Sequence, residues 1–147
     1  MPDYPIFHEY NFPYIFGLQN NRPLHRLPVY SKELNAYKEA KELVKDIYGV
    51  VQRLPQEERY ALADQLRRAV ISVPSNIVEG MNRISDKEKS HFLEIAYASL
   101  MEVYCQIDIA TDLGYIDNCK FKELEQSINT VARLISGLRK YTLNTKH

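Results

Sequence analysis

The chain has 147 residues, 45% of them hydrophobic and 26% charged, with 19 basic and 19 acidic side chains. High apolar content and zero net charge exclude a disordered chain, and the length suits one domain with one core. The charge balance is not that of a polybasic nucleic-acid-binding protein. Five glycines and no tryptophan disfavour a barrel or a repeat array.

The sequence predicts a cytoplasmic protein with no membrane contact. No stretch approaches the roughly 20 apolar residues that span a bilayer. Residues 1–14 are acidic and aromatic and lack the basic start of a signal peptide. Two cysteines, Cys105 and Cys119, make no disulfide framework, so we expect reduced thiols.

Residues 1–29 are predicted to form an irregular arm, because proline repeatedly interrupts any helix there. The arm is also rich in aromatic side chains, which makes it too apolar for a free tail. Two interpretations remain open: the arm packs on its own bundle, or it docks on a neighbouring subunit. Its prolines and aromatics are Pro2, Pro5, Pro13, Pro23, Pro28, Tyr4, Phe7, Tyr10, Phe12, Tyr14 and Phe16.

Residues 30–147 are predicted to form a four-helix bundle, because apolar residues recur with the helical period from Ser31 onward. Ser31 is the expected N-cap of the first helix, and Pro55 is expected to end it. The second helix is predicted to start near Pro55 and to continue through Pro74 with a kink, ending between Gly80 and Ile84.

The third helix is predicted to open with a capping box, with Ser85 at the N-cap and Glu88 three residues later. Gly114 is its expected stop. The fourth helix is predicted to begin near Asp117 and to extend to about Tyr141. Short connections make consecutive helices antiparallel, so the fold class is all-α, an up-down-up-down bundle.

Charge is distributed unevenly despite the neutral total. Residues 94–117 hold five acids and no Lys or Arg, whereas residues 133–147 hold four basic side chains and no acid. The third helix is therefore acidic and the C-terminal end basic. The candidate nucleic-acid contacts are Arg133, Arg139, Lys140 and Lys146.

A polar stripe borders the apolar face of the second helix, with spacings of four, four, three and four residues. Its members are Arg68, Ser72, Asn76, Glu79 and Arg83. We favour a hydrogen-bond network, within the chain or between subunits, over a surface that meets phosphate. Asn76 or Ser72 is expected to satisfy backbone groups released by Pro74.

No catalytic motif is present, so the sequence predicts a non-enzymatic protein without cofactor or metal. Glu88 and His91 form a Glu-x-x-His unit of the kind that builds di-iron sites in bundles. Such a site needs a second unit and two further inward glutamates. None of His8, His25 and His147 has that spacing in a helix, and capping already explains Glu88.

Residues 29–141 resemble the four-helix-bundle proteins encoded in intervening sequences of bacterial large-subunit (23S) rRNA genes. The similar motifs are Leu54-Pro55-x-x-Glu58-Arg59-Tyr60-x-Leu62, Gln65-Leu66-Arg67-Arg68-Ala69, Ser72-Val73-Pro74-Ser75-Asn76-Ile77-x-Glu79-Gly80-x-x-Arg83 and Phe92-Leu93-x-Ile95-Ala96-x-x-Ser99-Leu100-x-Glu102. A structurally similar relative is the accessory variability determinant of diversity-generating retroelements. That relative forms a homopentamer, binds nucleic acid and associates with a reverse transcriptase.

The resemblance implies a closed homo-oligomer, a pentamer, that acts as an RNA- or DNA-associated accessory protein. The polar stripe, Tyr60 and Tyr97 would then lie near subunit contacts. Zero net charge predicts weaker binding than the relative's basic surface provides, because phosphate affinity scales with neutralised charges. The alternative is a scaffold that recruits another protein without touching nucleic acid.

Overall fold

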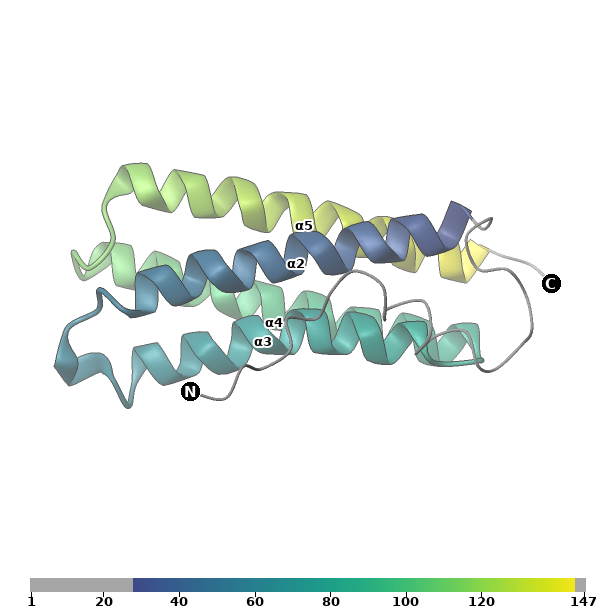
Figure 1. Cartoon of the computed structure of the whole chain (residues 1–147), viewed down its shortest axis with the longest axis horizontal. Coiled ribbons are helices and arrows are strands. Elements are labelled where there is room, and N and C mark those ends of the chain that lie inside the picture. Colours follow the sequence, from purple (N-terminus) through teal and green to yellow (C-terminus); the bar gives the residue numbers. More distant parts are fainter. Residues whose placement is uncertain (1–27, 145–147) are drawn as a thin grey trace, which may run out of the picture.

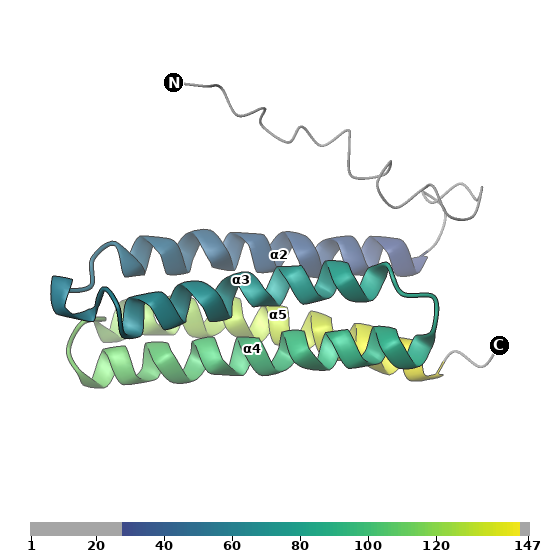
Figure 2. The same cartoon turned by 90° about the horizontal axis from the view of Figure 1, so that it is seen from below.

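The computed structural model describes residues 28–144 (Figure 1). Its helices in chain order are α2 (Pro28–Val51), α3 (Leu62–Met81), α4 (Asp86–Asp112) and α5 (Asn118–Asn144), with a short 3₁₀ turn η2 (Gln56–Glu58). The helices lie side by side, and each runs antiparallel to the next (Figures 1 and 2). α5 also packs on α2, so the predicted all-α up-down-up-down bundle is confirmed.

One apolar core runs the length of the bundle and draws on all four helices. Leu43, Leu66, Leu100 and Leu124 are each at most 1% exposed, one from each helix. α3 and α4 approach closely at Gly80. A β-carbon there would lie 3.3 Å from both the Lys89 carbonyl oxygen and the Phe92 β-carbon. The missing side chain therefore permits this approach.

The predicted ends of α4 and the start of α5 are confirmed by local contacts. The Ser85 hydroxyl accepts a hydrogen bond from the Glu88 backbone N–H at 3.2 Å, as an N-cap should. Gly114 follows α4 with φ of 78°, a left-handed conformation that favours glycine. The Asp117 carboxylate accepts from the Lys120 N–H at 2.8 Å and caps α5.

α2 begins earlier than predicted. Its first residue is Pro28, so Ser31 lies inside the helix and is not its N-cap. Proline suits the first helical position, because its φ is already helical and its missing N–H would have no partner there. α2 therefore includes residues 28 and 29, which the sequence pattern had assigned to the arm. Predictions about residues 1–27 lie outside the described part of the chain.

The predicted start of the second helix at Pro55 is wrong. Pro55 precedes η2, and α3 begins only at Leu62. Ala61 has φ −112° and ψ −102°, which interrupts the helical conformation between the two elements. The Leu62 N–H donates to the Glu58 carboxylate at 3.4 Å, so a side chain provides the first acceptor for α3.

α3 continues through Pro74, as the unbroken apolar series predicted. Proline removes one backbone donor and crowds the carbonyl four residues earlier. Side chains supply donors in that turn: the Ser75 hydroxyl donates to the Ile71 carbonyl, and the Asn76 amide to the Ser72 carbonyl, both at 2.8 Å. The carbonyl that loses its helical donor at Pro74 is that of Val70, four residues earlier, so the bond from Asn76 to the Ser72 carbonyl does not confirm the expected role of Asn76.

Candidate nucleic-acid interface

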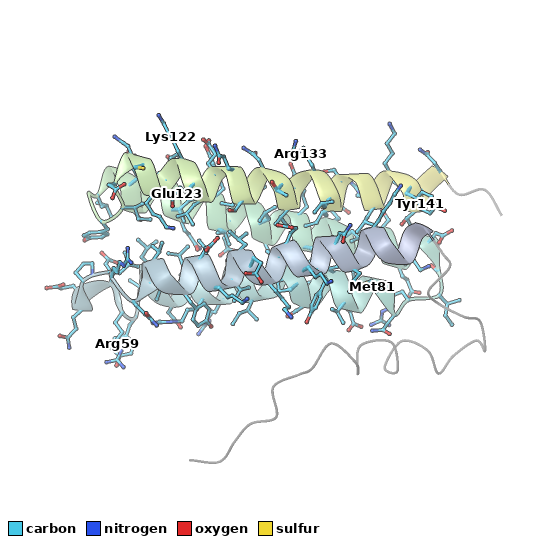
Figure 3. All side chains as sticks on the ribbon, turned by 45° about the horizontal axis from the view of Figure 1, so that its top comes forward. Arg59, Met81, Lys122, Glu123, Arg133 and Tyr141 are labelled. Atoms are coloured by element: carbon cyan, nitrogen blue, oxygen red, sulfur yellow. The ribbon has the colours of Figure 1, made fainter. Side chains whose placement is uncertain are left out.

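The side of α5 that faces away from the core carries a row of three cations: Lys122, Arg133 and Lys140. We call this row the α5 face. All three side chains are exposed. They lie eleven and seven residues apart, close to whole numbers of turns, so they share one side over about 27 Å. Figure 3 shows Lys122 and Arg133 projecting outward along the same edge of α5.

No acidic side chain compensates the α5 face within the part of the chain that the structure describes. The two acids of α5 have other partners. Glu123 lies 3.0 Å from Lys120, and Glu125 accepts a hydrogen bond from the Tyr104 hydroxyl at 3.3 Å. The side chains between the cations are neutral and polar: Gln126, Asn129 and Ser136. The α5 face is therefore a row of positive charge among hydrogen-bonding groups.

Three hollows lie along the seam between α4 and α5, and two of them meet at Tyr97. The larger of these two, about 840 Å³, is lined by Tyr97, Gln126, Asn129, Thr130, Ala132, Arg133 and Ser136. The smaller, about 450 Å³, is lined by Glu94, Tyr97, Ala98, Ile135, Ser136, Arg139, Lys140, Leu143 and Asn144. Tyr97 and Ser136 belong to both hollows, which therefore form one groove beside the α5 face.

The four predicted nucleic-acid contacts do not form one unmatched cluster. Arg133 and Lys140 lie on the α5 face. Arg139 instead crosses the seam, where its guanidinium lies 3.0 Å from the Glu94 carboxylate and donates to the Ser90 hydroxyl at 3.3 Å. Arg139 thus has an acidic partner that the sequence analysis did not foresee. Lys146 lies outside the described residues.

Lys122 was not among the predicted contacts, which all lie in the acid-free segment 133–147. The available signal was periodicity. Lys122 precedes Lys140 by eighteen residues, five whole helical turns, and so must share its side of the helix. The adjacent acid Glu123 made Lys122 look compensated in the sequence. In the structure Glu123 lies on a different side of the helix and pairs with Lys120.

The central part of the α3 stripe forms a contact inside the chain. The Ser72 hydroxyl lies 2.8 Å from the Ser99 hydroxyl of α4, and the Asn76 amide donates to the Ser72 hydroxyl at 3.0 Å. These groups are partly buried between the two helices. The favoured interpretation, a hydrogen-bond network, therefore holds for Ser72 and Asn76.

The rest of the stripe divides. Glu79 and Arg83 form an ion pair, and the Arg83 guanidinium lies over the Phe92 ring of α4 at 4.8 Å. Arg68 is more exposed and pairs with Asp64 of its own helix at 3.2 Å. The stripe thus mainly joins α3 to α4 and offers no row of unpaired cations to phosphate.

The side of α4 that faces away from the core carries apolar residues in its centre: Ala98, Met101, Cys105 and Ile109. We call these four the α4 face. They are exposed, with Met101 at 36% and Ile109 at 45%. The nearby acids are Glu102, Asp108 and Asp112, and the helix has no Lys or Arg after Lys89. α4 is therefore apolar on two sides, only one of which the bundle core covers.

Tyrosines near the acids hold their protons firmly. Burial, and then the Glu125 and Asp108 carboxylates, raise the pKa of Tyr104. Burial and Glu58, whose carboxylate accepts from the Tyr115 hydroxyl at 3.2 Å, raise the pKa of Tyr115. Both phenols are neutral donors at neutral pH and add no charge to either face.

The Glu-x-x-His unit shows no metal-binding arrangement. Glu88 and His91 are both exposed, and Glu88 lies in the capped first turn of α4. Within residues 28–144, no group of three or more His, Cys, Asp or Glu side chains is placed to hold a metal ion. No helix in that range is long and apolar enough to cross a membrane.

These features define an antiparallel helical-bundle protein with a basic outer row on one helix and an apolar, acidic face on the next. The family model described as 23S rRNA-intervening sequence protein matches residues 32–137. The chain belongs to this family, as its motifs indicated. The matched range contains α3, α4 and most of α2 and α5.

A solved structure has the same fold. It is a protein of unknown function from the S23 ribosomal protein family of Bacteroides thetaiotaomicron VPI-5482, with a TM-score of 0.69 and 18% sequence identity. The similarity covers 74% of this chain and 98% of that one. At this identity the likeness speaks for the fold alone. No curated protein matches the chain.

Proposed function

We propose that this protein is a non-enzymatic RNA-associated accessory protein that binds RNA phosphates through the α5 face. The observation that carries the proposal is the row of Lys122, Arg133 and Lys140, none of which has an acidic partner among the described side chains. Cations that already neutralise a carboxylate gain less from phosphate, so unpaired ones contribute most.

We further propose that the chain assembles into a closed homo-oligomer, a pentamer by family resemblance, in the cytoplasm. The α4 face supports assembly, because soluble proteins rarely leave a helix apolar on its outer side. Repetition around a ring would multiply the α5 face and offset the weak charge of one chain. Exposed thiols at Cys105 and Cys119 fit a reducing compartment.

RNA binding can be tested by titrating a structured RNA at several salt concentrations against wild type and Arg133→Gln. Each phosphate contact contributes about 0.7 to 0.9 to the slope of log affinity against log salt. We expect Arg133→Gln to lower that slope by about this amount for each chain in contact. The affinity should fall with little dependence on RNA sequence.

Lys45→Gln is the matched control. It removes the same net charge, but Lys45 lies on α2 and is paired with Glu42 at 2.7 Å. Its salt slope should equal that of wild type. Equal slopes for Arg133→Gln and Lys45→Gln would contradict contact at the α5 face. Absence of wild-type binding at low salt would reject RNA association.

The alternative is a protein–protein scaffold without direct nucleic-acid binding, and the α4 face is the specific observation that favours it. Its apolar centre and acidic neighbours suit a basic amphipathic helix of another protein. DNA is a further alternative to RNA. A parallel titration with DNA of the same phosphate number distinguishes the three cases: binding of RNA, binding of DNA, and binding of neither, which is expected of a scaffold.

A further inference from the structure

Tyr97 lies where two of the hollows between α4 and α5 meet. It is not part of the α5 face, and the proposed phosphate contacts do not involve it. Its side chain is 38% exposed. Small residues line the groove around it, namely Ala98, Ala132 and Ser136. Tyr97 has no hydrogen-bond partner among the described residues, whereas Tyr104 and Tyr115 donate to Glu125 and Glu58. The groove therefore presents a partly exposed aromatic ring whose hydroxyl has no hydrogen-bond partner among the described residues.

Cations lie on both sides of Tyr97 along the groove. Arg133 lines the larger hollow and Lys140 the smaller. The seven residues between them correspond to about 10 Å along α5. Glu94 is the one acid that lines the two hollows meeting at Tyr97, and its carboxylate lies 3.0 Å from the Arg139 guanidinium. An anionic strand lying in the groove would therefore meet a cation at each end, Arg133 and Lys140, and the Tyr97 ring between them.

We propose that this groove binds single-stranded RNA, with one base stacked on Tyr97 and the flanking phosphates held by Arg133 and Lys140. Any base can stack on an aromatic ring, so the recognition is independent of sequence. In a duplex the base faces already stack on one another, and only the backbone remains to be contacted. The groove thus discriminates by strand state, while the α5 face alone does not.

This inference rests on the proposed RNA binding and adds to it a preference for single-stranded over double-stranded RNA. It is tested by fluorescence anisotropy with two labelled probes, an unstructured polyuridine RNA and a fully paired RNA duplex of equal phosphate number. The full chain is compared as wild type and Tyr97→Leu. We expect wild type to bind the single strand more tightly. Tyr97→Leu should weaken that binding by about 5- to 150-fold and leave duplex binding unchanged.

Two further variants isolate stacking from other effects. Tyr97→Phe keeps the ring and should restore most of the affinity that Tyr97→Leu loses. Tyr115→Leu removes a ring of similar exposure, 37%, whose hydroxyl is bound to Glu58 beyond the groove. It should leave binding of both probes at the wild-type level. Light scattering should give the same mass for every variant.

Three results would overturn the inference while RNA binding stands: Tyr97→Leu binds the single strand as wild type does, it weakens both probes equally, or it changes the assembled mass. The last would assign Tyr97 to a subunit contact. If wild type binds neither probe at low salt, the proposed function itself fails and this inference fails with it. The wild-type titration therefore separates the two failures.

Discussion

The α4 face and the α5 face belong to neighbouring helices of one bundle, yet they have opposite chemistry. The α4 face is apolar in its centre, with Met101 and Ile109 exposed, and the charged side chains beside them on the helix are all acidic. The α5 face has three cations and neutral polar groups, with no apolar centre. A water-exposed apolar centre favours a protein contact, whereas an uncompensated cationic row favours phosphate.

The comparison shows why a net charge of zero says little about binding. Nineteen acids and nineteen bases cancel in the sum, but α4 holds an excess of acids and α5 an excess of bases. On α2 the charges mix, as in the Lys45–Glu42 pair at 2.7 Å. On α4 and α5 they segregate. Local charge, not the total, determines which surface a polyanion meets.

Ile109→Glu is expected to have the largest effect, because it breaks the apolar character of the α4 face. A carboxylate buried without a partner at a subunit contact costs about 3 kcal/mol or more. That corresponds to at least about a 100-fold weaker association. Light scattering over a concentration series should show the assembly dissociating toward the 17.2 kDa chain.

Ile84→Glu is the control for that variant. Ile84 is 88% exposed in the turn between α3 and α4, outside the α4 face. It makes the same chemical change and should leave the assembly intact. If both variants dissociate alike, or if Ile109→Glu remains assembled, the α4 face is not the assembly surface.

Ser72→Ala is expected to have an intermediate effect and to show that a polar row need not be a binding surface. It removes the partner of Ser99 at 2.8 Å and of Asn76 at 3.0 Å. Asn76 keeps the Ser72 carbonyl as acceptor, so the loss falls mainly on the partly buried Ser99 hydroxyl and should lower the free energy of unfolding by about 1 kcal/mol. Urea unfolding measures this loss.

A double-mutant cycle with Ser99→Ala isolates the contact, since the two losses should not add. The salt slope of RNA binding should stay at the wild-type value in all three variants. Additive losses would mean that the two hydroxyls do not interact. A reduced salt slope of RNA binding would show that the polar stripe of α3 contributes to phosphate contact.

Arg139→Gln is expected to have the smallest effect. It tests whether Arg139 belongs to the RNA-binding surface together with the α5 face. The Arg139–Glu94 pair is partly exposed, so its loss should cost at most about 1 kcal/mol of stability. Because Glu94 already neutralises Arg139, the salt slope of RNA binding should not change. A fall as large as that of Arg133→Gln would show that Arg139 leaves Glu94 to contact RNA.

Local signals in the sequence predicted much of the fold. Ser85 as N-cap and Gly114 as helix stop need only neighbouring residues, and both are found in the structure. The predicted start of α3 was wrong because the position of that helix end depends on contacts of the Glu58 carboxylate. That carboxylate accepts from the Leu62 N–H and also from the Tyr115 hydroxyl, 57 residues away. A contact so distant in sequence leaves no periodic signal.

The candidate site was predictable only where one helix defines it. Arg133 and Lys140 follow from charge along α5, and Lys122 follows from the helical period. The pairing of Arg139 with Glu94 spans 45 residues and requires knowing how α4 and α5 are aligned. The groove at Tyr97 likewise exists only after both helices have packed.

The most direct test of the central claim is size exclusion with light scattering, with and without a structured RNA, at low and at physiological salt. The account predicts a multimer of several 17.2 kDa chains that gains RNA mass at low salt and loses it as salt rises. A multimer that gains no RNA mass even at low salt would contradict RNA binding and leave the scaffold. A monomer would contradict assembly through the α4 face.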